Sequence, residues 1–210
     1  MSFTYKDIRR MVRTKEKDNN EFTFSDYDIR DAVNEAIRYI SGKLADSNAD
    51  FNEKSRWYDE RDYQYKCDTD DKLHHHRPFS FKHDGVPLPD DFMALVAIKG
   101  KPHCDEPLTP CLSMNTPQLW EYKISGDRIY CGSPHFTLVY KASIPEVRED
   151  MDVIELPNFT KDHFVALVRM ILTQAEGDIM RDAVEMVVEA LLPKRRYRNA
   201  KVAMPFRIGW

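Results

Sequence analysis

In this chain of 210 residues, three consecutive histidines form the segment whose side chains are best suited to metal binding or catalysis. His74, His75 and His76 follow an aspartate-rich stretch that begins after Cys67. Imidazole and thiolate groups bind zinc when their spacing lets them converge on one ion. Three adjacent side chains do not converge in regular structure, although His74 and His76 would share one face of a strand. The other candidate ligands show no standard spacing: Cys67, His83, His103, Cys104 and Cys111. We expect a polar connecting loop and no metal site, with a metal-dependent enzyme as the weaker alternative.

Other signatures of catalysis are missing from the sequence. There is no G-x-S-x-G nucleophile motif, and the seven glycines are not grouped into a phosphate-binding loop. Asp90 and Asp91 could form a pair of carboxylates, but "LPDDF" is more typical of a turn that leads into a strand. The sequence therefore predicts no catalytic residues, no cofactor and no enzyme.

The C-terminal residues 194–210 carry a different charge from the rest of the chain. They hold six basic residues and no acidic ones, whereas the other 193 residues carry 25 basic and 35 acidic side chains, a net charge of −10. The basic residues are Lys194, Arg195, Arg196, Arg198, Lys201 and Arg207, and the aromatic ones are Tyr197, Phe206 and Trp210. Aromatic anchors among arginines are typical of a segment that docks on a partner protein. Nucleic-acid binding and a solvated tail are the alternatives.

Two capped helices are predicted at the N-terminus. Thr4 can cap a short helix that ends near Thr14. Ser25 and Asp28 have the spacing of a capping box, and the helix that follows them should end near Ala45. Its apolar residues recur every three or four positions, which predicts one buried face.

Two further helices are predicted near the C-terminus. Thr160 can cap the first one, and Gly177-Asp178 should end it. The second helix should extend from about Met180 to Leu192, where Pro193 stops it.

Short alternating segments bounded by prolines separate the two pairs of helices. Strands are predicted at Ala94–Ile98, 120–124, 128–132 and 136–142. Gly126-Asp127 should form a tight hairpin turn between the second and third of these strands. Residues 47–78 show no steady period, apart from a possible strand at 63–66.

These elements predict an α+β fold with an inserted sheet. Residues 1–50 and 151–193 should form a helical bundle, and residues 79–150 an antiparallel β-rich subdomain inserted into it. Residues 51–78 should be an irregular connecting segment, and residues 194–210 an extended docking tail. The chain contains no apolar run long enough to cross a bilayer and no secretory signal, so we expect it to stay in the cytoplasm.

The order of these segments resembles the head–tail adaptor (connector) proteins of tailed bacteriophages. The similarity covers about residues 4–45 and 86–190. It rests on five segments in the family's order: "YKDIRRMVRTK", "FSDYDIRDAVNEAIRYI", "LPDDFMALVAIKG", "YKISGDRIYCGSPHFTLVYKASIPEV" and "IELPNFTKDHFVALVRMILTQAEGD". The long segment 47–85 departs from the shorter members of the family.

The resemblance implies a structural virion protein at the head–tail interface, assembled in the host cytoplasm. Such proteins form a ring, usually a dodecamer, that docks on the portal and extends the DNA channel. Residues 194–210 would dock on the portal, while residues 79–147 would contact tail (nozzle or tail-tube) proteins or a neighbouring subunit. Packaged DNA would pass without sequence-specific binding, because an acidic ring wall repels it. The alternative is a nucleic-acid-binding regulatory protein that uses the same basic tail.

Overall fold

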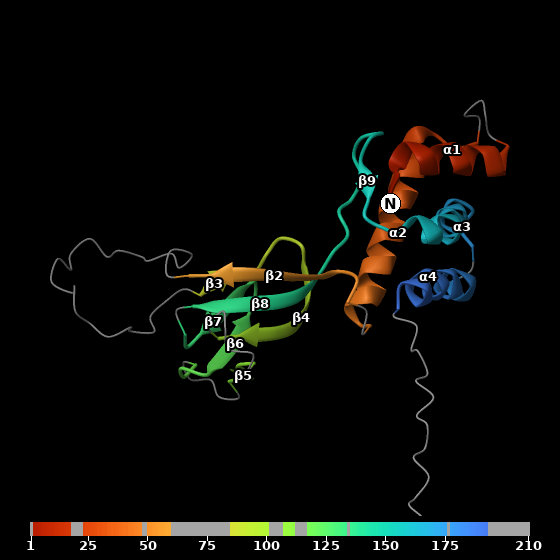
Figure 1. Cartoon of the computed structure of the whole chain (residues 1–210). Helices are drawn as coiled ribbons and strands as arrows, with labels where there is room; N and C mark the ends of the chain where they lie inside the picture. The colour runs from red at the N-terminus through yellow and green to blue at the C-terminus, as the bar shows by residue number, and fades with distance from the viewer. Residues whose placement is uncertain are drawn as a thin grey trace, which may run out of the picture.

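The chain folds into two lobes, each with its own hydrophobic core (Figure 1). A computed structural model describes residues 2–17, 23–47, 50–59, 85–100, 107–111, 117–133, 135–175 and 177–192. In this part of the chain, a helical lobe combines residues up to Ala45 with residues after Ala142, and a β lobe lies between them in sequence. The architecture is α+β, as the sequence predicts.

Four helices make up most of the helical lobe within the described residues. α1 (Tyr5–Glu16) and α2 (Asp26–Ala45) precede the β lobe, whereas α3 (Lys161–Leu172) and α4 (Gly177–Leu191) follow it. α3 lies between α1 and α4, and α2 packs against all three of them (Figure 1). Helices from the two ends of the chain therefore depend on one another for burial.

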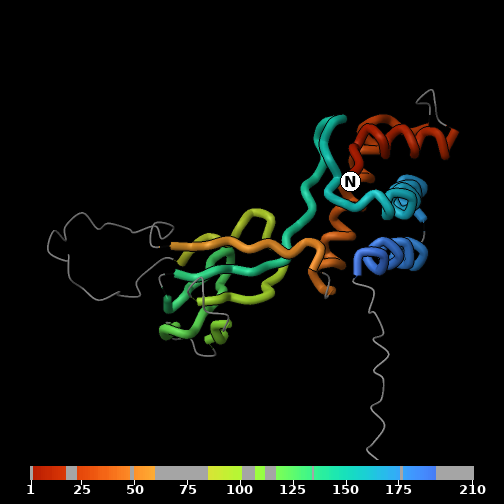
Figure 2. The backbone as a smooth tube through the Cα atoms, viewed as in Figure 1, coloured from red at the N-terminus to blue at the C-terminus, as the bar shows by residue number. Residues whose placement is uncertain are grey.

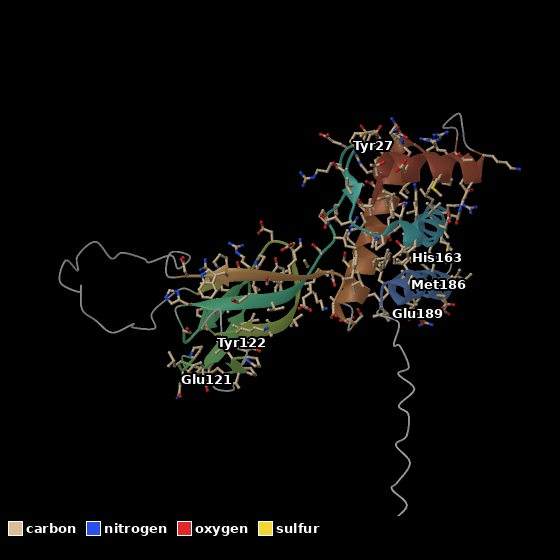
Figure 3. All side chains as sticks on the ribbon, in the orientation of Figure 1. Tyr27, Glu121, Tyr122, His163, Met186 and Glu189 are labelled. Carbon is tan, nitrogen blue, oxygen red and sulfur yellow. The ribbon has the colours of Figure 1, made fainter. Side chains whose placement is uncertain are left out.

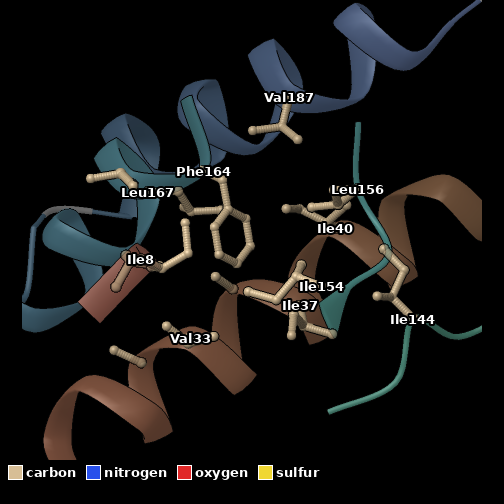
Figure 4. Close-up of a cluster of buried hydrophobic side chains, with 14 of the residues drawn as sticks. Ile8, Val33, Ile37, Ile40, Ile144, Ile154, Leu156, Phe164, Leu167 and Val187 are labelled. Atoms are coloured by element: carbon tan, nitrogen blue, oxygen red, sulfur yellow. The ribbon is translucent and has the colours of Figure 1, made fainter. Parts of the chain in front are cut away.

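The core of the helical lobe is built from one apolar face of each helix (Figure 4). Its fully buried side chains include Ile8, Val33, Ile37, Ile40, Phe164, Leu167 and Val187. On α2 these residues recur at intervals of three and four, the spacing that places side chains on one helix face. Ile144, Ile154 and Leu156, which lie between the β lobe and α3, complete the same core.

The predicted capping box at Ser25 and the predicted cap at Thr4 are both confirmed, and the structure shows that Thr4 also forms a capping box. The Ser25 hydroxyl accepts a hydrogen bond from the Asp28 N–H at 3.2 Å, and the Asp28 carboxylate accepts one from the Ser25 N–H at 2.8 Å. Thr4 and Asp7 make the same reciprocal pair at 3.3 and 3.2 Å. Each pair satisfies backbone donors that the first turn of a helix leaves free.

α3 begins directly after Thr160, as predicted, but the Thr160 side chain does not cap the helix. The predicted break between the two helices is also present, but it lies before Gly177-Asp178, which are the first two residues of α4. A 3-10 turn, η2 (Asn158–Thr160), leads into α3, so Thr160 is already in a helical conformation. Its buried hydroxyl donates to the carbonyl of Pro157 at 2.8 Å instead of accepting from the helix. α3 ends at Leu172, and α4 begins at Gly177.

A three-stranded sheet forms one side of the β lobe. β8 (Phe136–Ala142) is its central strand, flanked by β2 (Glu53–Tyr58) and β4 (Phe92–Lys99), and both pairings are antiparallel. The register of β4 shifts twice against β8, around Met93 and Val96. Such bulges bend a strand and turn the extra side chain outward, and both of these side chains are exposed.

A second, four-stranded sheet packs against the first. Its order is β3 (Val86–Pro87), β7 (Arg128–Cys131), β6 (Glu121–Ser125) and β5 (Thr109–Pro110). The β5–β6 pairing is parallel, and the others are antiparallel. The predicted hairpin is confirmed, because the turn between β6 and β7 contains two residues and Gly126 has a φ of 63°.

The prediction of an irregular segment at 51–78 is wrong for its first part. Residues 53–58 form β2, and its last residue, Tyr58, is fully buried and stacks on Phe136 in the core of the β lobe. The other five residues of β2 are exposed, so the strand shows no alternation of apolar and polar residues. Residues 60–78, including the possible strand at 63–66, lie outside the described residues.

The chain crosses between the lobes twice, at neighbouring positions (Figure 2). Asn52 and Ala142, at the two crossings, are joined by two hydrogen bonds of 2.9 Å, one from the Ala142 N–H and one from the Asn52 amide. Beyond Ala142, Ile144 and Val147 already belong to the helical core. The expected subdomain limits of 79 and 150 therefore differ from those of the β lobe, whose described residues span 52–142.

Candidate docking surfaces

The predicted docking tail and the histidine cluster both lie outside the described residues. This applies to Lys194, Arg195, Arg196, Tyr197, Arg198, Lys201, Phe206, Arg207 and Trp210, and to Cys67, His74, His75, His76, His83, His103 and Cys104. Among the residues that the structure describes, no group of three or more metal-ligating side chains occurs. Cys131 is free and buried in the β lobe, where burial raises the pKa of its thiol to about 11.

A cluster of four charged side chains closes the corner between α1, α2 and the loop before β9 (Val153–Ile154). Arg9 contacts Asp26 at 3.0 Å and Asp150 at 2.7 Å, and Arg13 contacts Asp26 at 2.5 Å. The same guanidinium of Arg13 also donates to the carbonyl of Phe24. Both carboxylates accept hydrogen bonds from arginine side chains, so the cluster stabilises this corner of the fold. Neither carboxylate is therefore free to act as a general base.

The same corner also fixes the N-terminus of the chain. β1 (Phe3–Thr4) pairs with β9, and the Tyr5 N–H donates to the carbonyl of Asp152 at 2.9 Å. The Tyr5 hydroxyl donates to the carbonyl of Asp26, and burial raises the pKa of Tyr5 to about 12. Tyr27, which is exposed at the start of α2, lies at the rim of this corner (Figure 3).

Two polar side chains of α2 hold the segment that returns from the β lobe. The Asn34 amide donates to the carbonyl of Val147 at 3.0 Å and accepts from the Val147 N–H at 2.8 Å. The Ser41 hydroxyl, two turns further along α2, accepts from the Ile144 N–H at 3.1 Å. All of these groups are buried, so each bond satisfies a backbone group that water cannot reach.

The carboxylate pair at Asp90-Asp91 lies in a turn before β4, as its sequence context predicts. Asp91 accepts hydrogen bonds from Lys54 at 2.8 Å and from the Tyr140 hydroxyl at 2.9 Å. Burial acts to raise the pKa of Asp91, but the hydrogen bonds from Lys54 and Tyr140 outweigh it and lower the pKa. This carboxylate therefore ties β2, β4 and β8 together in its ionised form.

The outer side of α1 carries a row of basic residues, here called the basic stripe. It consists of Lys6, Arg10, Arg13 and Lys17, at intervals of four, three and four residues. Arg13 is engaged in the charged corner, whereas the other three are exposed and have no ion pair within the described part of the chain. At these intervals Lys6, Arg10 and Arg13 lie one above the other along the helix, whereas Lys17 is the C-cap residue of α1, with a φ of 56°. The stripe thus gives this side of α1 a cationic surface that ends at the helix C-terminus.

The outer side of α4 carries the opposite charge at the same intervals. This acidic stripe consists of Asp178, Asp182, Glu185 and Glu189. Glu185 contacts Lys43 at 3.2 Å and Asp178 contacts Arg181 at 3.6 Å, whereas Asp182 and Glu189 have no ion pair among the described residues. Ile179 and Met186 flank the stripe and are 50% and 52% exposed; Figure 3 labels Met186 and Glu189 on this helix.

The two stripes lie on opposite sides of the helical lobe. α3 separates α1 from α4 in the layer, and the buried faces of α1 and α4 are turned toward the shared core (Figure 1). The lobe therefore has a basic side and an acidic side.

The two stripes were not predicted from the sequence. The identical 4-3-4 spacing of like charges in residues 6–17 and 178–189 is the signal that reveals them.

Within the described part of the chain, no helix has the length and apolar composition needed to cross a bilayer. Neither a scan against protein-family models nor a search of curated proteins returns a match for the chain.

Proposed function

We propose that the chain is a structural protein of a tailed-bacteriophage virion, a head–tail adaptor that assembles as a ring beneath the portal. In this proposal the helical lobe and residues 194–210 face the portal, and the β lobe offers the attachment surface for the tail. The ring extends the DNA channel, and the chain has a structural role without catalysis.

The observation that carries the proposal is the division into two lobes with separate cores at opposite ends of the molecule (Figure 1). A connector needs two surfaces that bind different partners, held at a fixed distance. The two hydrogen bonds between Asn52 and Ala142 join the two chain crossings, and the hydrogen bonds of Asn34 with Val147 attach the returning segment to α2. The ionisable corner of Arg9, Arg13, Asp26 and Asp150 is likewise engaged in holding the fold.

The charge distribution supports a docking role for the tail. Residues 194–210 contain six basic and three aromatic side chains, whereas the rest of the chain has a net charge of −10. An acidic body would repel passing DNA, while a basic aromatic segment binds acidic grooves of a partner with its rings as anchors.

The test is co-expression of the chain with the portal protein of the phage that encodes it. Mass measurement and electron microscopy should reveal a ring of chains bound to the portal ring. Deleting residues 194–210 should abolish the complex. Two matched variants separate the contributions: one replaces Tyr197, Phe206 and Trp210 with alanine, and the other replaces the six basic residues with glutamine. A full-length chain that forms neither a ring nor a portal complex would refute the proposal.

Nucleic-acid binding is the second candidate function, and the exposed basic stripe on α1 favours it. Lys6, Arg10 and Lys17 could contact phosphates together with the basic tail. In that case the chain would bind duplex DNA with an affinity that falls steeply with salt, and deletion of residues 194–210 would remove most of it. DNA binding without portal binding would replace the adaptor proposal with this one.

A further inference from the structure

We infer that the acidic stripe on α4 of one copy binds the basic stripe on α1 of the next copy, so that neighbouring subunits join head to tail. This inference deepens the proposed function and rests on it, because it assigns the surfaces that would close the ring. The occupant of each stripe is therefore a second copy of this chain.

The first argument is the match in spacing. Both stripes place four like charges at intervals of four, three and four residues. At about 1.5 Å per residue, the acidic stripe extends for about 16 Å along α4, and the three basic residues within α1 (Lys6, Arg10 and Arg13) extend for about 10 Å. The 4-3-4 interval of α4 reads the same in both directions, so the 4-3 interval of these three basic residues can come into register with it whether the two helices run parallel or antiparallel.

The second argument concerns which charges are free to pair. In each stripe the third member is already engaged within its own subunit, Arg13 with Asp26 and Glu185 with Lys43. Lys6, Arg10 and Lys17 on one side, and Asp182 and Glu189 on the other, have no ion pair in the described part of the chain. Complementary unpaired charges set the register and direction of an interface more than they set its affinity.

Apolar contact comes from the flank of the acidic stripe. Ile179 and Met186 lie on α4 and are about half exposed, although α4 is otherwise packed on the core. Lysine and arginine side chains cover apolar surface with their methylene stems while their charges reach acidic partners. The aliphatic parts of Lys6 and Arg10 can therefore cover these two residues.

The position of the stripes explains why a second copy fits better than DNA. A nucleic acid bound along α1 would leave the acidic stripe without a partner. A head-to-tail contact uses both stripes of every subunit, because they lie on opposite sides of the lobe (Figure 1). Contacts between two different surfaces of identical chains close into rings when the rotation between neighbours allows it.

The test uses two charge-reversal variants that do not alter buried residues. Variant A is Lys6→Glu/Arg10→Glu/Lys17→Glu, and variant B is Asp178→Lys/Asp182→Lys/Glu189→Lys. Each variant carries the same net sign on both stripes, so each should self-associate about tenfold or more weakly than the wild-type chain, since attractive contacts become repulsive. Sedimentation velocity and native mass spectrometry measure the association.

Mixing A with B supplies the decisive readout. The reversed α1 of A is complementary to the reversed α4 of B, and the unreversed stripes of the two variants also match. An equimolar mixture, or one chain that carries all six substitutions, should therefore recover the association of the wild type. A loss in A and B without recovery in either case would overturn the inference, because damage to the fold or loss of DNA binding cannot be repaired in this way.

A control places charge reversals of the same kind on the other lobe. Lys99→Glu/Lys123→Glu alters β4 and β6 and should leave self-association unchanged. The wild-type chain is examined at up to about 1 mM, where even a millimolar contact is half populated, and at about 0.01 M salt, where screening is weak. A wild-type chain that remains monomeric under these conditions overturns the inference.

The outcome is separable from that of the proposed function. Head-to-tail association without portal binding would retain the interface and refute the adaptor. Portal binding by a ring that variants A and B leave intact would retain the adaptor and refute this interface. If variant A loses salt-dependent binding to duplex DNA and the wild type does not self-associate, the basic stripe is a nucleic-acid surface instead.

Discussion

Replacing Asn34 with alanine should destabilise the helical lobe more than its small change in volume suggests. The Asn34 side chain serves both the N–H and the C=O of Val147, which is 113 residues away in sequence. Val147 is only 1% exposed, so neither group can turn to water when the amide is removed. Alanine also leaves the helix propensity of α2 intact or improved, which isolates the lost hydrogen bonds.

The expected loss follows from the number of backbone groups that lose their partner. Each buried polar group left without a partner costs about 1–3 kcal/mol, so Asn34→Ala should lower the free energy of unfolding by about 3 kcal/mol. For a chain of this size, that corresponds to a fall of about 6–12 °C in Tm. Ser41→Ala removes a single bond, to the Ile144 N–H, and should cost about half as much.

Circular dichroism and tryptophan fluorescence can follow the two lobes separately. The helices dominate the far-ultraviolet signal, whereas Trp57 and Trp120 both lie in the β lobe. In a Trp210→Phe background, urea unfolding monitored at 222 nm should shift strongly for Asn34→Ala and about half as much for Ser41→Ala. A shift below about 1 kcal/mol for Asn34→Ala, or a larger one for Ser41→Ala, would refute the reasoning.

The remaining predictions concern two glycines and one carboxylate. A Cβ at Gly132 would lie 1.7 Å from the backbone carbonyl oxygen of Gln118, so Gly132→Ala should destabilise the β lobe by several kcal/mol in urea unfolding monitored by tryptophan fluorescence. A Cβ at Gly42 meets nothing within 4 Å, so Gly42→Ala should instead stabilise α2 by about 0.5–1 kcal/mol, and equal effects of the two substitutions would contradict the packing described. Hydrogen bonds from Lys54 and Tyr140 make the folded-state pKa of Asp91 lower than its unfolded value, despite burial, so its stabilisation is present above about pH 4 and is lost as the pH falls through the folded-state pKa. Asp91→Asn should therefore flatten the acid limb of the stability profile measured by urea unfolding, and an unchanged limb would exclude this role.

Local signals predicted much of the fold correctly. The helix caps at Thr4 and Ser25 and the hairpin at Gly126 all depend on interactions within a few residues. Such interactions are encoded where they occur, so their sequence patterns are sufficient.

The errors arose where tertiary contacts decide the outcome. β2 (Glu53–Tyr58) was missed because five of its six side chains are exposed on an edge strand, which removes the alternation that marks a half-buried strand. Asn34 and Ser41 belong to the buried face of α2, although a polar residue there usually counts against burial. Their hydrogen-bond partners lie more than 100 residues away in the sequence, and no local pattern predicts these contacts.

The candidate docking surfaces also differ in how far the sequence alone predicts them. Residues 194–210 were predicted to be a docking tail from their charge and aromatic content alone, and they lie outside the described residues. The stripes on α1 and α4 are visible in the sequence only when the helical period is applied to charges as well as to apolar residues. Their placement on opposite sides of one lobe depends on how the helices pack.

The insertion of the β lobe between α2 and α3 sets the order in which the protein can fold during synthesis. The β lobe is built from one continuous stretch, from Asn52 to Ala142, so its core can close soon after that stretch leaves the ribosome. The core of the helical lobe needs both Ile8 and Val188, which are separated by nearly the whole chain. α1 and α2 must therefore wait with their apolar faces exposed until α4 has been made, which makes a completed β lobe the first stable part of every new molecule.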